Sequence, residues 1–186
     1  MPKLYYRWGT MNSSKTANAL MTKFNYEEKG RRVALMKPST DTRDGADIVK
    51  SRIGLQAKVI VVLPQTNLMN WYMQHRDYDV IIVDEAQFLT TAQVEQLKDI
   101  AVDFIPAFCF GLKTDFQTHL FEGSRRLLEL ADSIAELKSV CKCGRKAEVN
   151  ARIKDGHVVY DGEQIQIGGN ESYVSMCYSC WKKGKI

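Results

Sequence analysis

The segment Gly9-Thr10-Met11-Asn12-Ser13-Ser14-Lys15-Thr16 is the strongest indication of the fold of this chain, because it joins a strand-like segment to a helix-like one. A short apolar, β-favouring run around Leu4 to Trp8 precedes it, and the helix-forming run Ala17-Asn18-Ala19-Leu20-Met21 follows. A tight loop in this position that ends in Lys-Thr is typical of a nucleotide phosphate site, where loop N–H groups and the helix N-terminus face the anion. Lys15 then reaches the β- and γ-phosphates, and the Thr16 hydroxyl binds magnesium. An ordinary strand-to-helix turn is the weaker interpretation.

Ser14 departs from this phosphate-loop pattern, which has glycine at that position. If the backbone there needs a positive φ, serine carries a strain cost. The departure bears on ATP affinity rather than on the identity of the loop.

A second motif follows a predicted buried strand, Tyr78-Asp79-Val80-Ile81-Ile82-Val83, which is a continuous apolar run rather than an alternating one. The strand runs into Asp84 and Glu85. A carboxylate at the C-terminal end of such a strand lies where open α/β sheets bind ligands, so Asp84 is the expected magnesium-orienting acid. Strand alternation predicts that Glu85 points to the opposite side, where it can act as general base. Alone, Asp-Glu at a strand end is often a helix N-cap region, but beside a phosphate loop it indicates phosphoryl transfer or nucleotide hydrolysis.

The remaining pattern alternates strands and helices, which predicts right-handed βαβ units and a parallel sheet. We expect a P-loop, recombinase-like α/β fold with helices flanking the sheet. Residues 38–45 form a polar loop close to the phosphate site, either a mobile flap or a solvated connection. Further strands are predicted at residues 32–36, 58–63, 106–112 and 133–140, and helices at 16–28, 67–74, 90 or 91 to 100, and 124–131.

Composition is that of an ordinary globular protein, with 186 residues, 45% hydrophobic, 26% charged and a net charge of +4. No dense Lys/Arg block demands nucleic acid as a partner. Neither a signal-peptide core nor a bilayer-spanning apolar run is present, so no membrane association and a cytoplasmic location are expected.

The C-terminal part carries two cysteine pairs, Cys141/Cys143 and Cys177/Cys180, separated by a β-rich stretch with a hairpin across Asp155-Gly156. In a reducing compartment this arrangement favours a four-cysteine structural zinc site over disulfides. Cys109 lies in a strand pattern and is expected to be buried. The chain is thus predicted to comprise a nucleotide-binding kinase domain, residues 1–140, and a zinc-ribbon and substrate-lid (lasso) domain, residues 141–186.

The order of these motifs resembles the type II (cellular-type) thymidine kinases over nearly the whole chain. The most specific matches are Gly-Leu-Lys-Thr-Asp-Phe-Gln at 111–117 and Ile-Gly-Gly-Asn-Glu-Ser-Tyr at 167–173. The resemblance implies transfer of the ATP γ-phosphoryl group to the 5′-hydroxyl of thymidine, giving dTMP. It further implies magnesium with ATP, structural zinc, dTTP as feedback inhibitor and a homotetramer.

The resemblance also assigns roles to residues. Glu85 is the general base, and Gly9 to Thr16, Arg43, Asp84 and Gln87 bind the nucleotide and its metal. Arg43 and Arg152 match arginines near the phosphates. The expected apolar walls around the thymine ring are Met11, Phe88, Leu112, Phe116 and Phe121. Tyr173 and the backbone of Ile165, Ile167, Gly168 and Gly169 form the lid over the base, and Cys141, Cys143, Cys177 and Cys180 bind zinc.

Two other functions compete with this one. Asp-Glu-Ala-Gln resembles a helicase motif, so a nucleic-acid-stimulated P-loop ATPase with a zinc ribbon is the alternative, although a helicase needs two such domains and a basic stripe. A non-enzymatic reading is a zinc-ribbon interaction module on a degenerate nucleotide-binding domain, with Ser14 marking the degeneration. The presence of Lys15, Thr16, Asp84 and Glu85 together weighs against it.

Overall fold

The computed structural model describes residues 3–165 and 172–186 and contains the expected parallel sheet. Its six strands lie in the order β5-β2-β6-β7-β1-β8, and every pairing between neighbours is parallel. Because all the strands run the same way, their carboxyl ends meet at one edge. The strands are β1 (Leu4–Trp8), β2 (Val33–Pro38), β5 (Ile60–Val62), β6 (Val80–Val83), β7 (Ala107–Gly111) and β8 (Ser133–Glu136).

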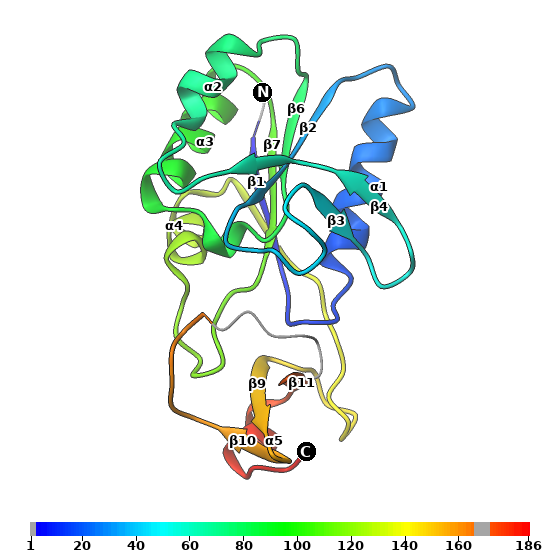
Figure 1. Cartoon of the computed structure of the whole chain (residues 1–186), viewed down its shortest axis with the longest axis vertical. Coiled ribbons are helices and arrows are strands. Elements are labelled where there is room, and N and C mark those ends of the chain that lie inside the picture. The colour runs from blue at the N-terminus through cyan, green and yellow to red at the C-terminus, as the bar shows by residue number, and fades with distance from the viewer. Residues whose placement is uncertain (1–2, 166–171) are drawn as a thin grey trace.

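Helices cover both faces of this sheet (Figure 1). The alternation of side chains along β6 shows the division: Ile81 and Val83 pack towards one face, Val80 and Ile82 towards the other. α2, α3 and α4 cover the first face, and α1 and a small β-hairpin cover the second. The helices are α1 (Lys15–Glu27), α2 (Leu68–Gln74), the 3-10 helix η1 (Ala86–Phe88), α3 (Thr91–Asp103) and α4 (Glu122–Leu130).

Side-chain caps explain where α2 and α3 begin. The Asn67 side chain accepts a hydrogen bond from Asn70 N at the start of α2. Of the two threonines expected to cap α3, Thr90 does so, in a reciprocal capping box with Gln93. α3 continues three residues beyond the predicted end at Ile100, because Leu97, Ile100 and Ala101 remain buried against the sheet.

The strand predicted over residues 58–63 is two strands in two different sheets. Lys58 ends β4 (Gln56–Lys58), which pairs with β3 (Ile48–Lys50) in an antiparallel hairpin that the sequence did not predict. Val59 N then donates to Asp47 O, and Ile60 to Val62 pair with β2 in the large sheet. An apolar run cannot reveal such a change of partner, since both halves are extended.

The C-terminal part is a small unit below the sheet in Figure 1. Its strands are β9 (Val149–Lys154), β10 (His157–Val159) and β11 (Tyr173–Met176), followed by the short helix α5 (Tyr178–Lys182). The predicted hairpin is confirmed: β9 and β10 are antiparallel, and Asp155 and Gly156 both have positive φ, 50° and 74°. The unit has its own core, in which Ala147, Ala151 and Met176 pack with the cysteines.

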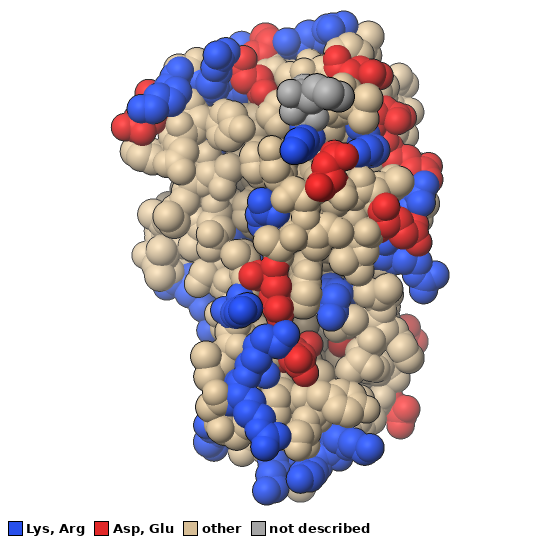
Figure 2. Space-filling model, turned by 180° about the vertical axis from the view of Figure 1, so that it is seen from behind, with Lys and Arg blue, Asp and Glu red and all other residues tan. Residues whose placement is uncertain are grey.

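Among the described residues, no helix has the length and apolarity needed to cross a membrane. Acidic and basic side chains are interspersed over most of the face in Figure 2, while basic ones predominate at the end formed by the C-terminal unit. The exposed basic residues of that unit include Lys142, Arg145, Lys182, Lys183 and Lys185.

Candidate active site

The phosphate loop connects β1 to α1 at the carboxyl edge of the sheet, and glycine is required where it leaves β1. A Cβ on Gly9 would lie 2.3 Å from Ser13 Oγ and 2.5 Å from Leu137 O. Ser14 has φ 60° and ψ 27°, so this serine adopts the left-handed conformation, in which a residue other than glycine is strained. Its side chain makes no capping hydrogen bond to the helix, so no such bond offsets the backbone strain at this serine.

Lys15 is buried and folds back over the loop. Its Nζ donates to Thr10 O at 2.6 Å and lies 3.4 Å from Ser13 Oγ. Burial lowers the pKa of Lys15 to about 8, although the carboxylates of Glu85 and Asp84 act in the opposite direction. The ammonium group is therefore held inside the loop, where its positive charge could pair with a bound anion.

Asp84 and Thr16 face each other across the end of the sheet. Thr16 Oγ1 donates to Asp84 Oδ2 at 2.7 Å. The second carboxylate oxygen, Oδ1, is buried and accepts no hydrogen bond from the part of the chain that the structure describes. Burial, and then the neighbouring Glu85 charge, raise the pKa of Asp84 to about 7. A buried oxygen without a donor, beside a threonine hydroxyl, suits the hard oxygen ligands of Mg²⁺, so these two residues could hold the ion.

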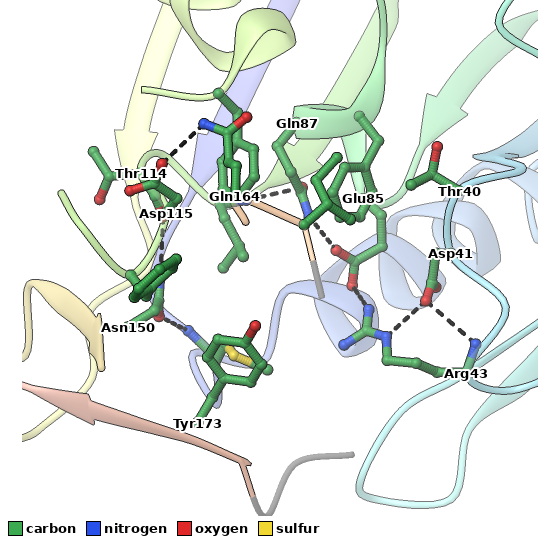
Figure 3. Close-up of a pocket in the computed structure, with 16 residues that line it drawn as sticks. Thr40, Asp41, Arg43, Glu85, Gln87, Thr114, Asp115, Asn150, Gln164 and Tyr173 are labelled. Atoms are coloured by element: carbon green, nitrogen blue, oxygen red, sulfur yellow. Dashed lines mark hydrogen bonds and ion pairs between the residues drawn. The ribbon is translucent and has the colours of Figure 1, made fainter. Parts of the chain in front are cut away.

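Glu85 does not follow the strand alternation predicted for it. β6 ends at Val83, and Glu85 has φ 52°, a left-handed turn into η1. Both carboxylate oxygens have donors: Oε1 forms an ion pair with Arg43 Nη2, and Oε2 accepts from Gln87 Nε2 at 2.5 Å (Figure 3). The turn and the two donors together fix the orientation of the Glu85 carboxylate.

The loop after β2 delivers Arg43 to this carboxylate. Arg43 Nε donates to Asp41 Oδ1 at 2.6 Å, and the Glu85 charge raises the pKa of Arg43 above its ordinary value. Burial alone would raise the pKa of Asp41, but the Arg43 guanidinium holds it below its usual value. The polar loop over residues 38–45 was expected to lie close to the phosphate site. Arg43, which belongs to this loop, does lie beside it.

Sequence reasoning missed the residue that ties this loop down, Lys37. Its side chain is fully buried, and Nζ donates to Gly45 O and Ile48 O, each at 2.9 Å, and lies 3.7 Å from Asp41 Oδ2. The available signal was a lysine at the end of an otherwise apolar buried strand. Buried lysines are rare unless they are paired, so such a position indicates a specific role.

An apolar pocket opens beside Glu85, with an empty volume of about 580 Å³ that includes space open to solvent (Figure 3). Phe88 and Phe121 meet edge to face in its wall, with ring centroids 5.7 Å apart. Gln164 Nε2 donates to Asp115 Oδ2 at 2.9 Å and links the lid segment to the 111–121 loop. The predicted pocket residues that line it are Met11, Phe88, Leu112, Phe116, Phe121, Ile165 and Tyr173, and Gln87, Thr114, Asp115, Asn150 and Gln164 add polar groups. Of the predicted lid, Ile167, Gly168 and Gly169 lie outside the described residues.

A larger and more polar cavity, of about 1580 Å³, lies over the phosphate loop. One side is the unpredicted β3–β4 hairpin, whose tip brings Arg52 opposite Lys15, where its charge contributes to lowering the pKa of that lysine. The two cavities share part of their lining. The shared residues are Met11, Asp41, Arg43, Glu85 and Leu112.

Arg152 lies behind the wall of the apolar pocket and is in the lining of neither cavity. Its guanidinium stacks 3.7 Å from the centroid of the Phe116 ring, and its Nε donates to Tyr173 Oη at 3.0 Å. β9 places Arg152 opposite Tyr173 in the register with β11, which explains this position.

The four predicted zinc ligands come together in the C-terminal unit. Their Sγ atoms all lie within 4.8 Å of one another, and Cys143 Sγ and Cys177 Sγ are 3.7 Å apart. A tetrahedral site with Zn–S bonds of about 2.3 Å has sulfur–sulfur edges of about 3.8 Å. The tight first pair, Cys-Lys-Cys, therefore fits a four-thiolate zinc site. Cys109 is buried far from this cluster in β7, as expected.

Comparison with known proteins identifies the family of this chain. The sequence model of the thymidine kinase family matches residues 2–181. The thymidine kinase of Streptococcus gordonii is 45% identical over 190 residues, covering 100% of this chain and 99% of that protein. The thymidine kinase of Streptococcus thermophilus is 46% identical over 185 residues (97% and 94%), and that of Rhodopirellula baltica 44% over 182 residues (95% and 86%). The chain therefore belongs to the thymidine kinase family.

Proposed function

We propose that this protein transfers the γ-phosphoryl group of ATP to the 5′-hydroxyl of thymidine, with Glu85 as the general base. The observation that supports this most directly is that Glu85 and Arg43 line both cavities. A donor bound over the phosphate loop and an acceptor bound in the apolar pocket would meet at these two side chains. Phosphoryl transfer needs mainly positioning and charge stabilisation, and this junction offers both.

Each cavity suits one substrate. The phosphate cavity carries the cations Lys15, Arg43 and Arg52. The smaller pocket has aromatic and aliphatic walls with a few polar groups, as a flat base requires. Glu85, at the junction, would take the proton of the acceptor hydroxyl, while Arg43 would stabilise charge on the transferred group.

Magnesium would be held through Thr16 and Asp84 and would neutralise charge on the phosphates of ATP. Zinc would be held by the four cysteines as a structural ion that replaces a large core in the C-terminal unit. We place the boundary between kinase and lasso domains at residues 140 and 141. On the resemblance to the family we further propose dTTP as feedback inhibitor, a cytoplasmic location and a homotetramer, for which the exposed Met21 and Phe24 on α1 offer apolar surface.

Incubation of the purified protein with Mg-ATP and a panel of nucleosides tests the proposal. Thymidine should yield dTMP with equimolar ADP, and purine nucleosides should yield no monophosphate. ATP hydrolysis that is stimulated by nucleic acid, without any nucleoside monophosphate, would instead assign the protein to the P-loop ATPases.

A further inference from the structure

The main-chain groups of Met11, in the phosphate loop, are bound by two side chains of the C-terminal unit. Met11 N donates to Asn150 Oδ1 at 2.7 Å (Figure 3), and Met11 O accepts from Ser175 Oγ. Both side chains are almost completely buried, with 4% and 8% of their surface exposed. The phosphate loop and these two strands are separated by more than 130 residues in the sequence.

Asn150 and Ser175 form one structural feature. They lie directly opposite each other in the antiparallel pairing of β9 with β11, so their side chains leave the same face of that small sheet. The next pair on that face is Arg152 and Tyr173, of which Tyr173 lines the apolar pocket. One face of the sheet therefore contacts the walls of both cavities.

The opposite face of the same strands packs on the cysteine cluster. Ala151 and Met176 belong to the core that includes Cys141 and Cys177, and Met176 directly precedes Cys177. Side chains alternate along a strand, so a displacement of the cysteine core would move Asn150 and Ser175 as well. A second contact, Thr10 Oγ1 to Ser139 Oγ at 2.5 Å, joins the loop to the segment that leads into the unit.

The phosphate loop needs support of this kind because its backbone is strained. Asn12 and Ser14 both have positive φ, 66° and 60°, on either side of Ser13. Non-glycine residues in this conformation are strained and persist where the surrounding structure holds them in place. Two N–H groups of the loop already have acceptors within the protein: Met11 N donates to Asn150 Oδ1, and Ser13 N donates to Thr10 O at 3.3 Å.

We propose that Asn150 and Ser175 are positioning residues for ATP: they hold the Met11 peptide, and through it the zinc-binding unit sets the conformation of the phosphate loop. The identification of the ligand as ATP rests on the proposed function. A single neutral hydrogen bond contributes enough to change a dissociation constant between about twofold and about tenfold.

The test uses the full-length, zinc-loaded protein and a non-hydrolysable ATP analogue with magnesium, without nucleoside. Ser175→Ala should weaken analogue binding about two- to tenfold and accelerate hydrogen exchange of the Met11 amide, with zinc content unchanged. Ser175→Thr keeps the hydroxyl and should restore both quantities. Ser179→Ala, in α5 of the same unit, is the matched control and should leave both unchanged.

Asn150→Ala provides an independent variant, because it removes the acceptor of Met11 N itself. Met11 exchange and analogue binding at wild-type values in both Ser175→Ala and Asn150→Ala would overturn the proposal, as would weaker binding with unchanged Met11 exchange. Absence of dTMP formation by the wild type would contradict the proposed function instead, because analogue binding and Met11 exchange are read without thymidine.

Discussion

Lys37 Nζ donates to the carbonyl oxygen of Gly45 at 2.9 Å and thereby ties the end of β2 to the loop that carries Arg43. The same ammonium group binds Ile48 O at the start of β3. The fully buried side chain of Lys37 thus fixes the segment between the large sheet and the hairpin. Arg43 belongs to that segment, and its guanidinium forms an ion pair with Glu85.

Lys37→Met should release this loop while filling the space of the aliphatic stem. We expect kcat to fall on the order of 10²-fold, since a displacement of about 1 Å in a positioning group has that effect, with little change in the KM for thymidine. Steady-state kinetics and limited proteolysis across residues 41–48 measure the two effects. Lys58→Met, at an exposed position on β4, is the control. Equal kinetics for the two variants would show that Lys37 does not position the loop that carries Arg43.

Glu85→Gln should lose most turnover and keep ATP binding. The amide preserves the shape of the side chain but cannot accept the proton of a substrate hydroxyl, and loss of a general base costs about 10²–10⁴-fold in rate. Rapid-quench measurement of dTMP formation, together with titration of an ATP analogue, separates the two quantities. Asp103→Asn, exposed at the end of α3, serves as control. Near-wild-type turnover by Glu85→Gln would assign the base elsewhere.

Ser14→Gly should stabilise the protein, because glycine adopts φ 60° without the steric cost that serine has. We expect the free energy of unfolding to rise by about 1 kcal/mol, measured by urea denaturation without nucleotide. Ser14→Ala is the matched control and should be close to wild type, since the serine side chain makes no capping hydrogen bond. A stabilising alanine would show that the hydroxyl, rather than the backbone, is unfavourable.

Lys15 makes the nucleotide-free protein less stable at neutral pH. Its pKa is lowered from 10.5 to about 8 by burial, so the unfolded chain binds this proton more tightly than the folded one. The penalty is therefore complete below pH 8 and is relieved as the pH rises from 8 to 10.5, by about 3 kcal/mol at most. Lys15→Met should accordingly unfold at higher urea concentration than wild type at pH 7, without nucleotide or magnesium, and show a flatter stability profile between pH 8 and 10.5. It should no longer bind ATP. Parallel profiles for the two proteins would contradict the assigned pKa.

Metal removal should distinguish the five cysteines. The native protein is expected to bind one zinc ion, and a strong chelator should release it and expose four thiols to a disulfide reagent. Cys109 should remain unreactive until the protein unfolds, because burial raises the pKa of its thiol to about 12. Cys109→Ala should keep the zinc, whereas Cys177→Ser should lose it. A fifth thiol that reacts together with the other four would contradict the burial of Cys109.

The parallel sheet, the phosphate loop and the cysteine cluster were all predictable from the amino-acid sequence alone. Each depends on contiguous residues or on residue types with few other uses. A buried strand needs a run such as Val80 to Val83, a phosphate loop needs Gly9 and Lys15 at fixed spacing, and four cysteines in two close pairs indicate a metal site. These sequence patterns are local, so they can be recognised without knowing the tertiary contacts of the chain.

Other features of the site depend on backbone turns and on contacts between segments that are distant in the sequence, and only the folded structure shows them. The left-handed conformation of Glu85 directs its carboxylate to Arg43, and no strand periodicity predicts that turn. The same is true of the β3–β4 hairpin and of the hydrogen bonds that Lys37 donates to its loop. It is also true of the hydrogen bonds between Met11 and the side chains of Asn150 and Ser175. These features involve ordinary polar residues or partners that are far apart in the sequence. Hydrogen-bond partners of this kind are set by the geometry of the packed chain, because the same asparagine or serine would be unremarkable in a solvent-exposed strand.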